Sequence, residues 1–109
     1  MRQATAFLFP SMLESCPLTL LEAMACGAPI AASDVPPMPE LCGNAAVYFN
    51  PRDSRSVASA LADILAGAGL RARLIRAGYA RAAEFTWERT VRGLIEMFCR
   101  VGQAALIRN

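Results

Sequence analysis

Two glutamates, Glu14 and Glu22, stand on either side of the start of a predicted helix, with seven residues between them. A carboxylate offers two acceptor oxygens, which suit the vicinal hydroxyls of a sugar or a ribose. A helix start adds unpaired backbone N–H groups and the positive end of the helix dipole, which favour a phosphate. Because Pro17 has no N–H, the amides of Leu18 and Thr19 are the expected donors.

These carboxylates also have a simpler interpretation. Glutamates near a helix start offset the helix dipole while they remain solvated. Glu14 and Glu22 are eight positions apart, so they do not form a pair one helical turn apart. Spacing alone therefore leaves the binding interpretation and the solvated interpretation both open.

The elements that would position these residues alternate between strand and helix. Three short apolar runs predict strands at residues 4–9, 29–33 and 45–49. A run of good helix formers predicts a helix at residues 18–26, and one helical turn is expected around residues 39–41. This order predicts parallel pairing, and in such a sheet ligands bind beyond the carboxyl ends of the strands.

The pattern becomes helical after the third strand. Three runs with helical spacing of apolar residues begin near Ser54, Leu70 and Thr86, and Gly67 and Gly69 separate the first two. Ser54 and Thr86 are the expected N-caps. The predicted fold class is therefore α/β, as half of a doubly wound, partial Rossmann-like parallel sheet followed by three helices.

Apolar side chains also recur within these last helices. The first is expected to bury one face that consists of Val57, Leu61, Ile64 and Leu65. Trp87 lies on the apolar stripe of the third helix, so we expect it to anchor the core rather than to stack on a ligand. Asp34 either approaches the ligand from the end of the second strand or forms a turn.

The composition excludes several kinds of chemistry. The 109 residues carry eleven basic side chains, all Arg, and a net charge of +2. Without Lys and His, the chain lacks a Schiff-base lysine, the usual general base and the commonest metal ligand. The four cysteines show no C-x-x-C spacing, which argues against a zinc site. The scattered arginines indicate solvated helix faces rather than a nucleic-acid surface.

The sequence also bears on location. No apolar run approaches the ~20 residues that span a bilayer. No secretory signal precedes the cysteines, so we expect reduced thiols in a cytoplasmic protein without a transmembrane segment. Peripheral contact with the inner face of the membrane stays open. Nothing in the sequence places a base beside Cys16, so we do not expect a nucleophilic role for it.

Residues 10–29 closely resemble the signature of the retaining glycosyltransferases called family 4, or glycosyl transferases group 1, which have the GT-B fold. The residues that match this signature are Pro10, Ser11, Glu14, Glu22, Ala23, Met24, Ala25, Gly27 and Pro29. Further matches at residues 39–40, 51–53 and 85–88 extend the resemblance over essentially the whole chain. The chain thus resembles the last third of such an enzyme.

The resemblance implies a role for each matching site residue. Glu14 would be the catalytic residue and would contact hydroxyls of the donor sugar. Glu22 would hold the ribose of the nucleotide, and Ser15, Leu18 and Thr19 would contribute to nucleotide-sugar binding at the helix start. The resemblance implies no cofactor, because the nucleotide diphosphate sugar is a substrate, and no Asp-x-Asp motif suggests a metal.

Two departures from the family pattern matter. Cys16-Pro17 replaces the usual Phe-Gly, which removes one amide and stiffens the loop. We expect this to alter details of donor binding rather than to abolish the site. The family's basic residues for the diphosphate have no counterpart here. We therefore expect residues 1–109 to be part of a C-terminal nucleotide-sugar-binding domain, with the N-terminal acceptor domain absent.

The predicted function is transfer of a hexose from a nucleotide diphosphate sugar to a glycan or lipid acceptor, with retained configuration, as in polysaccharide biosynthesis. This fragment alone is expected to be inactive. One alternative is a truncated remnant or half of a split enzyme that needs an N-terminal GT-B domain on another chain. Another is a related epimerase or phosphorylase, which would generally lack the E-A-M-A run. The uncovered edge of the first strand and one face of the last helix predict self-association.

Overall fold

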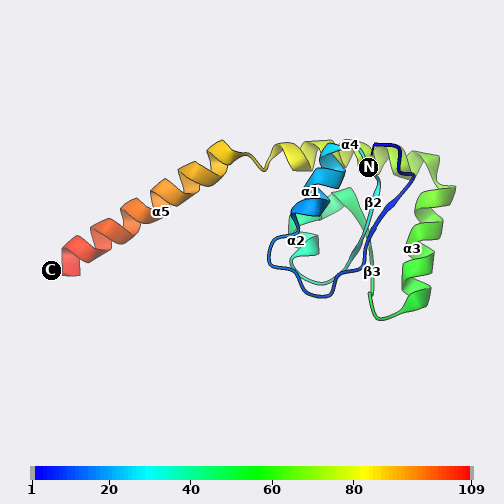
Figure 1. Ribbon diagram of the computed structural model, residues 1–109, viewed down its shortest axis with the longest axis horizontal. Coiled ribbons are helices and arrows are strands. Elements are labelled where there is room, and N and C mark those ends of the chain that lie inside the picture. Colours follow the sequence, from blue (N-terminus) through cyan, green and yellow to red (C-terminus); the bar gives the residue numbers. More distant parts are fainter. Residues whose placement is uncertain (1, 109) are drawn as a thin grey trace.

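Residues 2–108 are described by a computed structural model, in which three strands form one parallel sheet. The strands are β1 (Phe7–Phe9), β2 (Ile30–Ser33) and β3 (Ala46–Phe49), in the order β1-β2-β3. The helices are α1 (Leu18–Ala25), α2 (Met38–Cys42), α3 (Ser54–Ala66), α4 (Ala68–Ala83) and α5 (Trp87–Arg108), with a 3-10 turn, η1 (Gly43–Ala45). The predicted α/β class, the parallel pairing and the three final helices are confirmed (Figure 1).

The sheet separates two apolar clusters. All four residues of β2 are buried, as expected for a central parallel strand that is covered on both faces. Ile30 and Ala32 pack with α1 and α2, whereas Ala31 packs with α3 and α4. Because side chains alternate along a strand, β2 contributes to both clusters. The predicted apolar runs therefore mark this strand correctly, although β1 begins only at Phe7.

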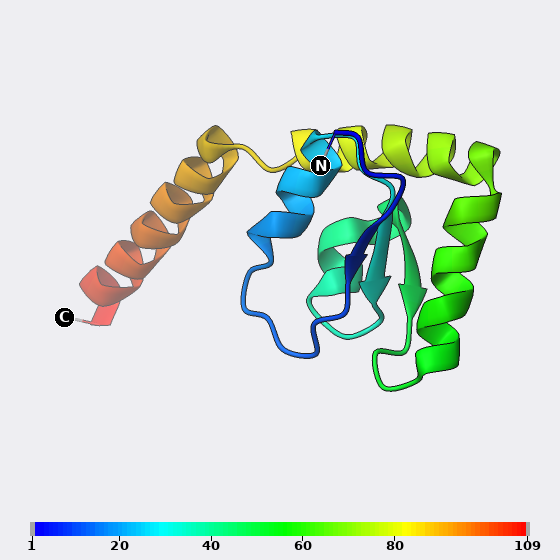
Figure 2. The ribbon, with the colours of Figure 1, turned by 45° about the vertical axis from the view of Figure 1, so that its right-hand side comes forward.

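The carboxyl ends of the three strands are tied together. The Ser33 hydroxyl donates to the carbonyl of Phe9 at 3.3 Å, and the backbone N–H of Asp34 donates to the carbonyl of Phe49 at 2.9 Å. Ser33 is completely buried and, through this bond, satisfied. The loop that leads into α1 starts at this edge of the sheet (Figure 2).

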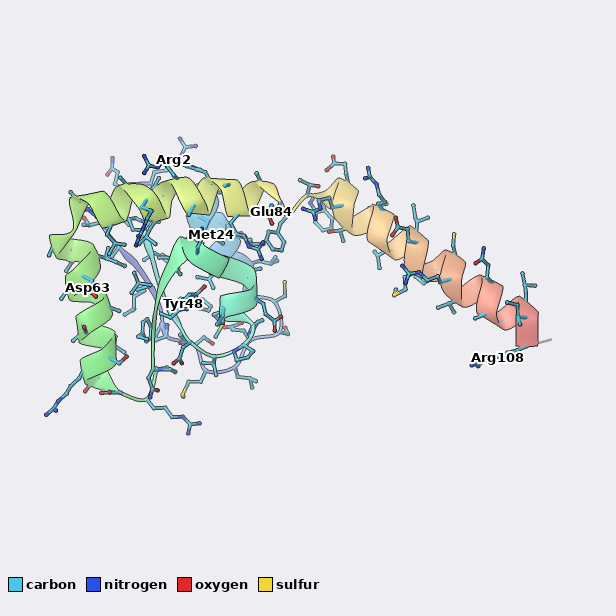
Figure 3. All side chains as sticks on the ribbon, turned by 180° about the vertical axis from the view of Figure 1, so that it is seen from behind. Arg2, Met24, Tyr48, Asp63, Glu84 and Arg108 are labelled. Atoms are coloured by element: carbon cyan, nitrogen blue, oxygen red, sulfur yellow. The ribbon has the colours of Figure 1, made fainter. Side chains whose placement is uncertain are left out.

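Helix α4 lies across the opposite end of the sheet and packs against α1 (Figure 1). Gly78 of α4 lies over Met24 of α1, and Met24 is fully buried. Figure 3 shows Met24 beside α4. A Cβ atom at position 78 would lie 3.4 Å from Met24 Cβ, so glycine permits the close approach of the two helices. This contact fixes α1, the helix that carries the predicted site.

Three local predictions for α3 and α4 were wrong. Asp53, not Ser54, caps α3: its carboxylate accepts from the N–H of Arg55 at 2.9 Å, while Ser54 is already helical. Leu65 is 57% exposed, because α3 buries only the side that faces the sheet. Gly69 lies within α4, so the helix begins before Leu70; packing of the helix offsets the cost of one glycine, about 1 kcal/mol.

Helix α5 stands apart from the rest of the molecule (Figure 1). Thr86 caps it as predicted, since its hydroxyl oxygen accepts from the N–H of Arg89 at 3.2 Å. Trp87, however, is 82% exposed, so the prediction of a core anchor was wrong. The spacing correctly indicated an apolar face, but no element of residues 2–108 packs along it. The molecule is elongated as a result, with extents of 62 × 27 × 18 Å.

Candidate functional site

The loop between β1 and α1 carries the first glutamate. The hydroxyl of Ser11 lies 2.9 Å from Glu14 Oε1 and 3.2 Å from the carbonyl of Leu13, so it donates to the carboxylate within a tight local turn. Glu14 is half-buried, and its hydrogen bond with Ser11 orients its carboxylate. Sequence reasoning did not assign Ser11 to the site, although its spacing of three from an acid is a signal for such a local hydrogen bond.

The backbone N–H groups at the start of α1 differ in whether they already donate a hydrogen bond within the chain. The N–H of Leu18 donates to the carbonyl of Cys16 at 2.9 Å, and the N–H of Leu20 donates to the carbonyl of Pro17 at 3.0 Å. The N–H of Thr19 has no acceptor within residues 2–108. Of the two predicted donors, Thr19 is therefore available to a ligand as it stands. The amide of Leu18 would have to exchange its own internal bond, and its role stays a prediction.

Helix α1 divides its surface between core and solvent. Leu20, Ala23 and Met24 are fully buried, whereas Thr19 and Glu22 are exposed. Thr19 and Glu22 are three positions apart, so their side chains lie on the same side of the helix. The packing of one face thus holds the other face, with the second predicted acid, at a fixed orientation to the sheet.

Two hollows adjoin the loop at Cys16. One has a volume of about 280 Å³ and is lined by Ser15, Cys16, Pro17, Pro37, Glu40, Leu41, Arg81 and Phe85. The other has a volume of about 290 Å³, is largely apolar, and is lined by Cys16, Leu18, Leu21, Leu41, Phe85, Thr86, Trp87 and Thr90. Ser15 and Leu18 therefore each line a hollow, whereas Glu14, Glu22 and Thr19 line neither.

Arg81 fastens α4 to α2 beside the first hollow. Its guanidinium donates to the carbonyl of Leu41 at 2.7 Å and to the carbonyl of Glu40 at 2.5 Å. It also pairs with Glu84 at 2.6 Å and lies 5.2 Å above the ring of Phe85. A planar guanidinium can make these contacts at once because its donors point in fixed directions. Sequence reasoning missed this residue, since the two carbonyls that it binds lie 40 and 41 positions away in the sequence.

We expect Arg81→Ala to lower the free energy of unfolding by about 1–3 kcal/mol, because it removes charge-assisted bonds to two carbonyls that close α2. Arg81→Lys should recover less than half of this loss, since an ammonium group cannot reach both carbonyls and the carboxylate together. Arg73→Ala, on the exposed side of the same helix, is the matched control. Urea unfolding measures all three, and equal midpoints for Arg81→Ala and Arg73→Ala would contradict the assignment.

The remaining polar groups near the site have limited chemistry. Asp34 is exposed and continues the pairing of β2 with β3 through its own N–H. Burial raises the pKa of the Cys42 thiol to about 11, although the nearby Arg81 opposes this, so Cys42 stays a neutral thiol. Cys16 is an exposed free thiol. Among residues 2–108, no group of three His, Cys, Asp or Glu side chains could hold a metal ion.

Comparison with known proteins identifies the family of the chain. Residues 1–81 match the family described as glycosyl transferases group 1, and this match spans α1, the preceding loop and the whole sheet. The chain belongs to this family. The resemblance inferred from residues 10–29 is therefore confirmed.

Curated relatives and a solved structure agree with this membership. The chain is 34% identical over 85 residues to an O-antigen chain mannosyltransferase B of Escherichia coli, covering 78% of this chain and 22% of that protein. It is 34% identical over 99 residues to a D-inositol 3-phosphate glycosyltransferase of Acidothermus cellulolyticus, covering 89% and 22%. A sucrose-phosphate synthase from Thermosynechococcus elongatus superposes with a TM-score of 0.77 at 28% identity, covering 89% and 25%.

These comparisons fix the fold and the family. The superposition supports the Rossmann-like assignment of the group 1 chain. The chain spans only 12–22% of the length of the first curated relatives that it matches. No helix in the described part of this group 1 chain is long and apolar enough to cross a membrane.

Proposed function

We propose that this group 1 chain binds a nucleotide diphosphate sugar and supplies the donor side of a retaining hexosyl transfer to a glycan or lipid acceptor. Glu14 contacts the hydroxyls of the donor sugar and is the catalytic residue. Glu22 holds the ribose, and Ser15, Leu18 and Thr19 meet the nucleotide diphosphate. The nucleotide sugar is a substrate, so the proposal requires no resident cofactor.

One observation carries the proposal. The loop with Glu14 starts at the carboxyl edge of the parallel sheet (Figure 2) and leads directly into α1, whose exposed face carries Thr19 and Glu22, within the segment that matches the family. Parallel sheets bind ligands at this edge, and a helix start there favours the phosphates. The mannosyl and glycosyl transfers in the names of the relatives support a hexose donor and a polysaccharide setting.

The proposed chemistry follows from charge. When the sugar leaves, negative charge develops on the departing diphosphate, and the N–H groups at the start of α1 stabilise that charge. The carboxylate of Glu14, oriented by Ser11, accepts hydrogen bonds from sugar hydroxyls. The acceptor site belongs to an N-terminal domain in the proposal, so catalysis requires that domain to be supplied with this chain, whether joined to it or separate.

The test is titration of the 109-residue chain with UDP-glucose and with GDP-mannose by calorimetry. We expect saturable binding of at least one of them. We expect Glu22→Ala to weaken it by about 10- to 100-fold, because hydrogen bonds between the carboxylate and ribose hydroxyls are lost. Glu22 is exposed, so the substitution should leave the unfolding midpoint unchanged.

Glu96→Ala is the matched control, since Glu96 is an exposed helical glutamate on α5. It should bind both sugars as the parent chain does. Equal affinities in Glu22→Ala and the parent chain would remove the ribose role. Failure of the parent chain to bind either sugar would overturn the proposal for this chain.

A further inference from the structure

One hollow lies between the two chain connections that follow β1 and β2. It is the hollow of about 280 Å³ that Ser15, Pro37 and Glu40 help to line, and we call it the Glu40 hollow. Ser15 belongs to the loop between β1 and α1, whereas Pro37 and Glu40 belong to the loop after β2 and to α2. Figure 2 shows both connections leaving the same end of the sheet, its carboxyl edge. Parallel sheets bind their ligands in crevices at this edge, so the hollow has the position of a ligand site.

Two polar side chains of the Glu40 hollow have unused hydrogen-bonding capacity. Glu40 and Ser15 are exposed, and within residues 2–108 neither the carboxylate nor the hydroxyl has a hydrogen-bond or ion-pair partner. A carboxylate provides two acceptor oxygens, and a serine hydroxyl can both donate and accept. This pair of side chains therefore suits a ligand that carries hydroxyls on neighbouring carbons.

The wall that carries Glu40 is held in place from α4. The guanidinium of Arg81 donates to the main-chain carbonyls of Glu40 and Leu41 and also pairs with Glu84. These bonds use the backbone of Glu40 and leave its side chain free. The carboxylate thus projects from a fixed backbone, which lowers the entropic cost of ordering the wall when a ligand binds.

Charge and size narrow the class of ligand. Among the described residues, Glu40 and Arg81 are the charged ones that line the hollow, and Arg81 already contacts two carbonyls and a carboxylate. A phosphate would be repelled by the carboxylate of Glu40, so a neutral hydroxylated group is favoured. The volume of about 280 Å³ is just below the usual range for ligand pockets, about 300–1,000 Å³, and suits one sugar ring rather than a whole nucleotide sugar.

We propose, building on the proposed donor function, that the Glu40 hollow binds a hexose ring and that Glu40 is a further specificity-determining residue. Its carboxylate accepts hydrogen bonds from the hexose hydroxyls, and the nucleotide sugar supplies the hexose. Ser15 lines the hollow and directly follows Glu14, so the hollow adjoins the loop that carries the proposed catalytic carboxylate. A hexose of the acceptor has the same chemistry and is the second possible source.

Glu40→Gln should weaken binding of UDP-glucose or GDP-mannose by about 10-fold in calorimetric titrations, because an amide lacks the charge and one acceptor oxygen of the carboxylate. Binding of UDP or GDP, which carry no hexose, should change by less than about twofold. Glu88→Gln is the matched control, since Glu88 is also an exposed glutamate in the first turn of a helix. Glu40→Gln should keep the urea midpoint of the parent chain, because the bonds from Arg81 end on main-chain carbonyls.

NMR titration with free glucose and free mannose separates this proposal from the donor function. A parent chain that binds no sugar nucleotide overturns the donor function alone. Amide signals of Ser15 and Glu40 that then shift with a free hexose in the parent, but not in Glu40→Gln, support the hexose site and assign it to the acceptor. The hexose site is overturned when neither sugar-nucleotide affinity nor these shifts differ between Glu40→Gln and the parent. An equal loss of affinity for UDP and UDP-glucose overturns it as well.

Discussion

Phe49→Ala is expected to lower the free energy of unfolding by about 3–5 kcal/mol, because it empties the centre of one of the two apolar clusters. Phe49 ends β3 and is only 2% exposed. Its ring packs among Ala31, Ala60, Ile64 and Leu74, which come from β2, α3 and α4. Small neighbours such as the two alanines cannot fill the space that the ring leaves, so most of the cavity would persist.

Urea unfolding followed by circular dichroism measures this loss. Phe49→Leu is the control, because it keeps most of the apolar volume and should cost less than about half as much. A Phe49→Ala protein that unfolds within about 1 kcal/mol of the parent would show that the cluster between the sheet and α3 contributes little.

Leu20→Ala is expected to lower the free energy of unfolding by about 2–5 kcal/mol. Leu20 is completely buried on α1, in the cluster that joins this helix to the sheet and to α2. Leu18→Ala is a close control, since Leu18 lies on the same helix but is 59% exposed. This substitution should lower the free energy of unfolding by less than about 0.5 kcal/mol. Similar losses for the two variants would contradict the assignment of α1 faces.

Leu20→Ala should also weaken nucleotide-sugar binding, but by another route than Glu22→Ala. It reduces the fraction of folded chain, so its effect should diminish at low temperature or in a stabilising osmolyte. The Glu22→Ala effect should persist there, because it removes a contact rather than the folded helix. Comparison of the two variants separates the role of α1 in the core from its proposed role in the site.

The sheet and α1 could be predicted from the sequence because local signals agree with the final packing. The apolar runs that form β2 and β3 are short, bounded by Gly and Pro, and fully or partly buried, and Pro17 and Gly27 delimit α1. Family-like spacing around Glu14 and Glu22 located the candidate site. Where the local pattern and the final packing agree in this way, the sequence alone is sufficient to predict the secondary-structure elements.

Other features depend on contacts that a linear pattern does not contain. Trp87 lies on an apolar stripe as predicted, but burial requires a neighbouring element, and none is present along α5 within residues 2–108. Arg81 joins α4 to carbonyls of α2, which only the folded arrangement brings together. The internal bond of the Leu18 amide likewise results from the turn at Cys16, a detail of backbone geometry.

The crossing helix α4 has a consequence for how the molecule melts. Leu74 belongs to the cluster on one side of the sheet, while Ala77 and Ala82 pack against the cluster on the other. A single helix of sixteen residues therefore contributes side chains to both apolar clusters. Neither cluster can unfold while α4 stays in place, so we expect the two clusters to unfold together on heating and to give a single calorimetric peak. Helix α5 should unfold independently of them.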